Sequence, residues 1–454
     1  MTGKRKSSSR NPKTVKCSKL QTNSMKKSAI NEEEKVQLDF LVVEKIALLT
    51  KLKFAPDICQ ELVSLSFAKA LRSFYSKKKV TLSFSVSFSE NLDDYGECPD
   101  ILLSIGGLSQ QSEEEIKFDE ENFEKLNEAV QQILTRFRQI HLKIPMYVNN
   151  IDNEDFASIV SEAVNDVRDV TIETLDITFE YPVLVDCHRL IKKLSRNLKV
   201  LNLCIYDPTD QYEESWKKFW QTVGSCTKLE KLSVKFDYTL MAGEDPGHET
   251  DNALLVQIAN GVKRLKIKNF RTNLQEGEED ERTMEWLPRA FAKNEHLRHL
   301  DIDTYFESGC YLGDLVSVKD GPLVLSRLES LKIKIGDGTE CRKDWEASFK
   351  KVLPAMSDQA VLKITVSSFC KEDTRGLLRM YLELSHQTAR RIKLRLLFSK
   401  DNMNFGAVLK KALSGLSSMK KFRGLKTVPD GAWTRLLFGN ADLMVEAKRS
   451  KSGI

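Results

Sequence analysis

The stretch "LESLKIKI", residues 328–335, alternates apolar and polar side chains with a period of two residues. Such alternation predicts a short β-strand that buries one face and exposes the other. The underlying pattern, apolar-x-x-apolar-x-apolar, also occurs in "LKVLNL" (198–203), "LEKLSV" (229–234) and "LRHLDI" (297–302). Because the pattern returns at a nearly constant interval, we interpret it as a structural repeat rather than as isolated strands.

The middle apolar residues of this pattern place ten strand-like units along the chain, 30 to 35 residues apart. They are Ile140, Val170, Leu201, Leu232, Leu265, Leu300, Leu331, Leu362, Ile392 and Phe422. A single unit cannot bury its apolar side alone, so neighbouring units must stack into one continuous core. The period therefore predicts a solenoid of about ten units.

Helix-compatible stretches lie between the strand units. Apolar residues recur near a 3.6-residue period in 183–196, 213–225, 343–356 and 404–416,. A parallel strand pair needs a connection of about a dozen residues or more, and each unit leaves room for a helix there. The predicted fold class is α/β, a horseshoe with a strand layer and a helix layer. We assign the solenoid to 77–430 and a C-terminal cap with a basic tail to 431–454.

The strand motifs "LKVLNL", "LEKLSVKF", "LRHLDI" and "LESLKIKI" resemble leucine-rich repeats, and the resemblance covers about residues 135–425. Three residues past the last strand leucine, that family usually has Asn or Cys. This chain instead has Tyr206, Asp237, Phe270, Tyr305 and Gly336 at those positions. The resemblance therefore implies degenerate repeats, with a concave strand surface that binds a ligand.

Composition narrows the class of protein. The chain has 41% hydrophobic residues and no run of 18 apolar residues, so we expect no membrane span,. Its nine cysteines are scattered and include no C-x-x-C pair, which favours reduced thiols in the nucleus or cytoplasm,. Residues 1–33 read as a disordered basic tail, in which "GKRK" (3–6) resembles a nuclear-import signal,. A solvated tail without a receptor is the alternative.

Residues 34–76 contain the apolar stretch "FLVVEKIALLTKLKFAPDICQELVSLSFAKALRSF" (40–74), which fits three short amphipathic helices,. The stretch resembles an F-box, the module that docks a substrate receptor onto the Skp-type linker of a cullin–RING ubiquitin ligase. Glu44, Asp57 and Ile58 match its acidic and mid-motif positions, whereas Val42 and Leu65 depart from it. The resemblance implies linker contacts by Leu41, Ile46, Leu49, Ile58, Leu62 and Leu65.

A second interpretation of residues 40–74 needs no ubiquitin connection. Solenoids require a cap over their open end, and three amphipathic helices can provide one. The chain would then be a nuclear or cytosolic scaffold. The sequence is compatible with both interpretations.

The strand positions between the buried residues should face the concave side. At the expected positions, nine Lys or Arg stand against three acids, which predicts a basic concave stripe,. The predicted target-binding residues are Lys235, Lys266, Lys268, Lys332, Lys334, Lys393 and Arg395. An acidic or phosphorylated protein segment is the preferred target. Nucleic acid is a weaker candidate, since these positions include no aromatic residue for base stacking. Cations that only keep the sheet hydrated are a further possibility.

Catalytic and cofactor motifs are absent from the sequence. It contains no Walker loop, no G-x-G-x-x-G, no G-x-S-x-G and no H-E-x-x-H,. His296 and His299 lie three apart in one strand unit, so they should point to opposite faces and not share a metal,. We therefore expect no cofactor and no metal. The favoured function is a non-catalytic substrate-recognition adaptor of an SCF-type ubiquitin ligase.

Overall fold

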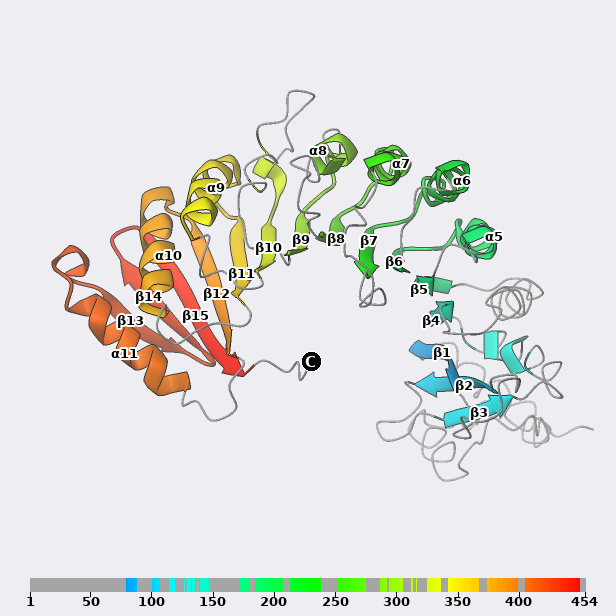
Figure 1. Ribbon diagram of the computed structural model, residues 1–454, viewed down its shortest axis with the longest axis horizontal. Helices are drawn as coiled ribbons and strands as arrows, with labels where there is room; N and C mark the ends of the chain where they lie inside the picture. Colours follow the sequence, from blue (N-terminus) through cyan, green and yellow to red (C-terminus); the bar gives the residue numbers. More distant parts are fainter. Residues whose placement is uncertain are drawn as a thin grey trace, which may run out of the picture.

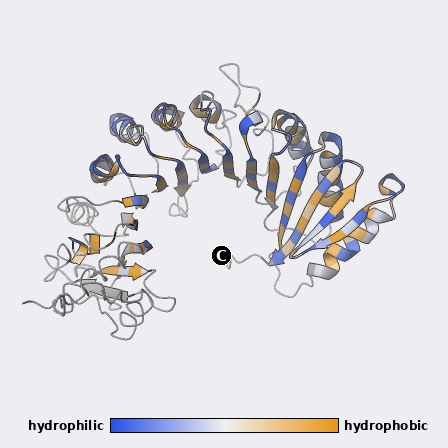
Figure 2. Ribbon diagram, turned by 180° about the vertical axis from the view of Figure 1, so that it is seen from behind, coloured by the Kyte–Doolittle hydropathy of each residue, from blue (hydrophilic) through white to orange (hydrophobic). Residues whose placement is uncertain are grey.

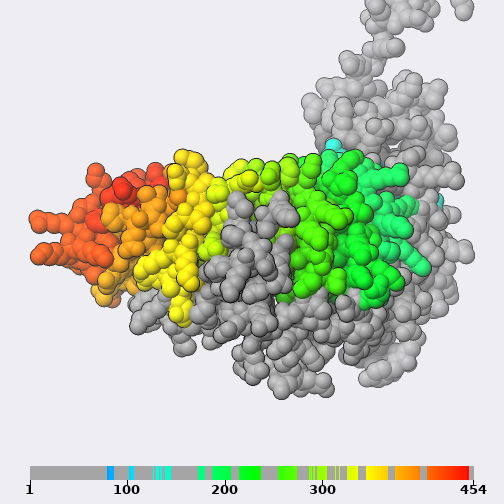
Figure 3. Space-filling view, turned by 90° about the horizontal axis from the view of Figure 1, so that it is seen from above, coloured from blue at the N-terminus to red at the C-terminus, as the bar shows by residue number. Residues whose placement is uncertain are grey.

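The computed structural model forms a curved arch with strands on its inner side and helices on its outer side (Figure 1). It describes residues 79–87, 100–106, 114–118, 139–146, 172–179, 184–206, 213–237, 252–274, 286–291, 294–304, 325–335, 342–366, 374–398 and 405–449, with single positions between 126 and 137 and at 312 and 316. The predicted α/β class with a solenoid-like arrangement is confirmed at this level. Viewed from above, the units follow one another in sequence order (Figure 3).

One fifteen-stranded sheet runs through the described residues, in the order β13-β14-β15-β12-β11-β10-β9-β8-β7-β6-β5-β4-β1-β2-β3. Most neighbouring strands in it are parallel. The parallel strands are β1 (Lys79–Ser87), β4 (Gln139–Met146), β5 (Ile172–Phe179), β6 (Val200–Tyr206), β7 (Lys231–Asp237), β8 (Asn269–Leu274), β9 (His299–Thr304), β10 (Ser330–Ile335), β11 (Val361–Val366), β12 (Arg391–Phe398) and β15 (Ala441–Arg449).

Antiparallel strands extend the sheet at both ends. β2 (Asp100–Gly106) and β3 (Glu114–Phe118) continue it beyond β1. β14 (Trp433–Phe438) and β13 (Lys426–Asp430) continue it beyond β15. All residues of the edge strand β13 are exposed, and it carries Pro429, whose missing N–H discourages pairing with another chain,. The boundary expected at 430/431 therefore falls inside this β-meander.

The helices return the chain to the start of the next strand. They are α5 (Leu184–Leu194), α6 (Glu213–Val223), α7 (Asn252–Val262), α8 (Trp286–Phe291), α9 (Arg342–Ala355), α10 (Thr374–Thr388) and α11 (Phe405–Ser417), with 3-10 turns η7 (Leu325–Arg327) and η9 (Lys420–Phe422). The helices predicted at 183–196, 213–225, 343–356 and 404–416 are confirmed as α5, α6, α9 and α11. A membrane-spanning helix would have to be longer and more apolar than any helix in the described ranges.

The core lies between the two layers. One row of strand residues, in register across the sheet, points at the helices and is at most 2% exposed. Its members are Leu142, Leu175, Leu201, Leu232, Phe270, Leu300, Leu331, Leu362, Ile392 and Leu443. Polar and apolar residues alternate along the strands (Figure 2). Each buried leucine of this kind stabilises the fold by about 1.5–3 kcal/mol.

Seven of the ten predicted unit centres lie in strands, and two lie elsewhere. Leu265 precedes β8 because α7 extends to Val262 and the chain then turns, so Phe270 takes the expected place in the row. Leu265 is still buried, at 4% exposure, which explains its strand-like pattern. Phe422 lies in η9 instead of a strand. Val170 lies outside the described residues, as do the tail 1–33 and the unit 34–76.

Adjacent helices approach closely at two glycines. A Cβ at Gly261 in α7 would lie 2.5 Å from the carbonyl oxygen of Trp220 in α6, and one at Gly224 would lie 2.7 Å from the Gly261 oxygen. Since these neighbours are backbone atoms in a packed core, they cannot move away easily.

We therefore expect Gly261→Ala to lower the free energy of unfolding by about 1–3 kcal/mol through overpacking. The matched control is Gly415→Ala in α11, where the nearest atom is the flexible Arg375 Cδ at 3.0 Å. Replacing a glycine inside a helix with alanine stabilises the helix by about 0.5–1 kcal/mol, so the free energy of unfolding of this variant should not fall. Urea denaturation of both variants measures this, and equal effects would contradict the packing account.

Candidate binding surface

The candidate site is the inner face of the arch. We use "inner face" for the alternate positions of β4 to β12 and β15 whose side chains point away from the helices. Successive strands are in register, so equivalent positions form rows that run across the strands. The middle row is Lys143, Asp176, Asn202, Ser233, Arg271, Asp301, Lys332, Lys363, Lys393 and Met444.

Among the side chains that the structure describes on the inner face, cations outnumber acids by eleven to five. The cations are Lys143, Lys231, Lys235, Arg271, Lys332, Lys334, Lys363, Arg391, Lys393, Arg395 and Lys448. The acids are Asp176, Asp301, Asp303, Asp442 and Glu446. Because the acids lie among the cations, the surface is a basic mosaic rather than a uniform basic track.

Three lysines stand side by side in the middle row, and we call Lys332, Lys363 and Lys393 the lysine ladder. Their strands β10, β11 and β12 pair in register, so the three Cα atoms are about 4.8 Å apart along the row,. The Lys332 amine lies 2.7 Å from Asp301 Oδ2, whereas Lys363 is exposed and has no ion pair among the described residues. Like charges on neighbouring strands destabilise a sheet, and a bound anion would relieve that repulsion.

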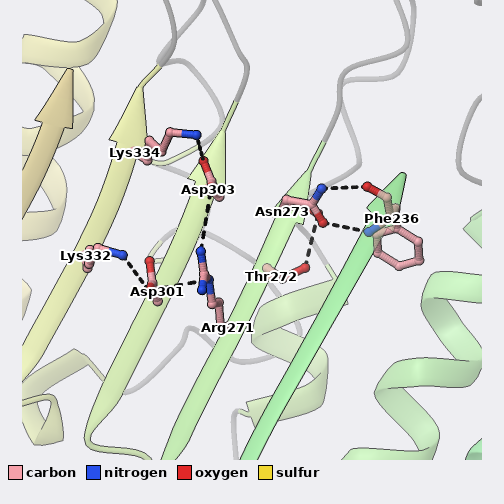
Figure 4. A network of polar contacts seen from close by, with 8 residues as sticks. All are labelled: Phe236, Arg271, Thr272, Asn273, Asp301, Asp303, Lys332 and Lys334. Atoms are coloured by element: carbon pink, nitrogen blue, oxygen red, sulfur yellow. Dashed lines mark hydrogen bonds and ion pairs between the residues drawn. The ribbon is translucent and has the colours of Figure 1, made fainter. Parts of the chain in front are cut away.

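A second group of cations lies on β8 to β10 (Figure 4). Arg271 Nε is 3.7 Å from Asp301 Oδ2, and Arg271 Nη2 is 3.7 Å from Asp303 Oδ2. Both carboxylates have closer partners, since Lys332 Nζ lies 2.7 Å from Asp301 and Lys334 Nζ lies 3.2 Å from Asp303. Arg271 is thus the most weakly held cation of this network.

The pairing of β7 and β8 ends early, at Val234 and Thr272. Beyond it, the Asn273 side chain replaces the backbone ladder: its Nδ2 donates to the Phe236 carbonyl oxygen at 2.6 Å, and its Oδ1 accepts from the Phe236 N–H at 2.7 Å (Figure 4). The amide side chain therefore satisfies backbone groups that would otherwise lose their partners where the strands separate.

The inner face is hollowed over β5 to β11, with a volume of about 800 Å³. Its lining on β5 and β6 includes short side chains such as Thr178 and Cys204, while long cations line it from β7 to β11: Lys231, Lys235, Arg271, Lys332 and Lys363. At the first end, Asp176 accepts hydrogen bonds from His141 at 2.7 Å and from Asn202 at 2.5 Å. The hollow is large enough for several residues of an extended segment.

The C-terminal end of the inner face adds an aromatic residue. Trp433 on β14 lies under Lys393 and Arg395, whose charged groups are 5.8 and 5.5 Å from the ring centroid,. Arg395 Nε also donates to Glu446 Oε2 at 2.7 Å. Sequence reasoning missed Trp433 because β14 does not carry the repeat pattern.

Five of the seven predicted target-binding residues lie on the inner face: Lys235, Lys332, Lys334, Lys393 and Arg395. The placement of Lys266 and Lys268 there is wrong, because both precede β8. Lys268 Nζ instead lies 2.9 Å from Glu230 at the start of the strands. Arg271, which the strand shift brings onto the inner face, is a second residue that sequence reasoning missed.

The remaining sequence predictions concern the linker contacts, the histidine pair, a metal site and the cysteines. The six predicted linker contacts, from Leu41 to Leu65, lie outside the described residues. His299 Nδ1 lies 2.9 Å from Ser330 Oγ, and His296 is exposed before the strand. Within the described ranges, no three His, Cys, Asp or Glu residues are grouped so that they would hold a metal ion. No disulfide joins the described cysteines, Cys187, Cys204 and Cys226.

Comparison with known proteins adds no assignment. A scan of the sequence against protein-family models gave no match, and a search of curated proteins gave none either.

Asp442 lies on β15, at the C-terminal end of the inner face, opposite Arg391 of β12. Burial works to raise the pKa of its carboxyl group, but hydrogen bonds from Arg435 and Arg391 outweigh this and hold that pKa below its usual value of 3.8. A carboxylate with a lowered folded-state pKa stabilises the protein above its unfolded-state pKa. That contribution is lost as the pH falls through the folded-state pKa.

We expect Asp442→Asn to melt at a lower temperature than the wild type at pH 7, because Arg391 and Arg435 lose their charged partner. The difference in melting temperature should shrink below about pH 4, where the wild-type carboxylate also becomes protonated. Thermal unfolding at pH 7 and pH 3 measures it. A difference that stays constant over this range would refute the ion-pair explanation.

Proposed function

We propose that the chain is a non-catalytic binding protein whose inner face captures an acidic or phosphorylated protein segment. The observation that carries this proposal is the lysine ladder, three adjacent cations of which the central one lacks a partner among the described residues. An anionic segment crossing β10 to β12 would remove their mutual repulsion. Cations around a concavity also raise its potential and speed the encounter with an anionic ligand.

We further propose that residues 34–76 connect this receptor to the Skp-type linker of a cullin–RING ligase. The support is the F-box resemblance of the sequence and its position ahead of leucine-rich-repeat-like units. The target would be held by contacts alone, in the nucleus or cytoplasm, and the ligase's other subunits would supply the chemistry. The rival is a scaffold whose residues 40–74 only cap the solenoid.

Nucleic acid is the second candidate ligand, and Trp433 beside Lys393 and Arg395 is the observation in its favour. Stacking on an aromatic ring flanked by cations is typical of single-strand binding. The acids Asp301, Asp303 and Glu446, however, interrupt the cations and would repel a backbone that is charged at every nucleotide, whereas a protein segment can carry its anions only opposite the cations. The protein segment therefore remains the preferred ligand.

The first test reverses one ladder charge. A fluorescein-labelled decapeptide of alternating Glu and Gly, a phosphoserine version and a single-stranded oligonucleotide serve as probes at low ionic strength. Lys363→Glu should weaken binding of the peptide probes by roughly tenfold, because it places an acid between Lys332 and Lys393. Fluorescence anisotropy measures the binding.

The matched control is Lys266→Glu, an equal charge change at an exposed lysine that lies off the inner face. It should leave binding nearly unchanged. If both variants lost the same amount of affinity for the peptide probes, the change in net charge alone would explain the loss. That result would contradict the proposal. Tighter binding of the oligonucleotide than of either peptide would favour the second candidate.

The second test concerns the ligase connection. The full chain should co-purify with a Skp-type linker at micromolar concentration, and Leu49→Asp combined with Leu62→Asp should abolish this, since an F-box docks through apolar contacts. Peptide binding by the same variant should persist. If the wild-type chain does not bind the linker, the proposed ligase connection is wrong. The scaffold, in which residues 40–74 only cap the solenoid, would then be the favoured interpretation.

A further inference from the structure

Beyond the lysine ladder, the inner face contains an arginine whose charged group is poorly bound. The Nε and Nη2 atoms of Arg271 form the edge that can take one carboxylate through two parallel hydrogen bonds. In the structure this edge is divided between Asp301 and Asp303, at 3.7 Å each, which is too long for hydrogen bonds,. Arg271 Nε is buried without a hydrogen-bond partner, although the side chain as a whole is 41% exposed.

Release of Arg271 would cost little electrostatically. Asp301 and Asp303 keep Lys332 and Lys334 as closer partners, at 2.7 and 3.2 Å, so neither carboxylate would be left without a cation (Figure 4). If either lysine left instead, its acid would keep only the more distant Arg271, at 3.7 Å. Among these three cations, Arg271 is the one that is available to a ligand.

The surroundings of Arg271 suit an anion. Ser233 stands directly across from it on β7, is only 8% exposed, lines the hollow and has no hydrogen-bond partner among the described residues. Lys231 and Lys235 lie on either side of Ser233 along the strand and also line the hollow. Neither lysine forms an ion pair with any residue of the described ranges. A hydroxyl donor, a guanidinium edge and two amines thus belong to the same part of the hollow's lining.

We infer that Arg271 turns from Asp301 and Asp303 into the hollow and binds one carboxylate or phosphate group of the captured segment, with Ser233 Oγ as a further donor. This inference rests on the proposed function. It identifies Arg271 as the residue that selects the anion by the arrangement of its oxygen atoms. β8 and β11 are three strands apart, so the group bound by Arg271 lies about 15 Å from the one at Lys363,. The segment must therefore carry two anionic groups about four to five extended residues apart.

The test preserves the positive charge at position 271 and removes the guanidinium edge that can bind two oxygen atoms. Arg271→Lys in the full chain should weaken binding of the alternating Glu/Gly decapeptide or its phosphoserine version by about tenfold, because an ammonium cannot bind two oxygens side by side. Ser233→Ala should weaken it several-fold. The matched control is Arg264→Lys, the same charge-preserving exchange at an exposed arginine that lies off the inner face, and it should leave affinity unchanged. Unaltered melting temperatures verify the fold, and the more strongly affected probe identifies the group.

The outcomes separate this inference from the proposed function. If Arg271→Lys and Ser233→Ala bind like the wild type while Lys363→Glu shows its roughly tenfold loss, the inference is wrong and the proposed function stands. If Lys363→Glu also binds normally, or the wild-type chain binds neither probe at low ionic strength, both are wrong.

Discussion

The structure depends on one packing constraint, the in-register burial of a single strand residue from every unit. Leu201, Leu232, Leu331 and their equivalents face the helices and are almost inaccessible to water. A shift of one residue in any strand would turn its apolar side chains outward, so the register is strongly fixed. The same constraint fixes the opposite face, because it aligns equivalent positions of neighbouring units into rows.

The alignment of equivalent positions into rows has an electrostatic consequence. When successive units carry lysine at the same position, the register forces the charges together, as at Lys332, Lys363 and Lys393. Elsewhere the chain compensates its cations: Asp301 and Asp303 partner the lysines of β10, and Glu446 partners Arg395. Positions without full compensation, among them Lys363 and the weakly held Arg271, are where a partner's anions fit best. Binding is thus proposed at the points where the sheet's own charge balance is incomplete.

The repeat pattern predicted the layers and four helices because apolar periodicity directly reflects burial. It failed where apolar residues are buried without being in a strand: Leu265 sits in a turn, and this misplaced Lys266 and Lys268 while concealing Arg271. Trp433 escaped prediction for a different reason. Its strand belongs to an antiparallel meander, and its position beside Lys393 depends on contacts between residues that are distant in sequence. Ion-pair distances, which decide which cations are available, cannot be read from sequence.

The most direct test of the central claim is to map where an acidic segment contacts the chain. A Glu-rich peptide carrying a photoreactive benzophenone can be cross-linked to the full-length protein, and the attachment sites identified by mass spectrometry. We expect the attachment sites on the inner face between β7 and β12, around Arg271 and Lys363. Attachment mainly to the outer helices α5 to α9 would contradict an arch that binds its partner on the concave side.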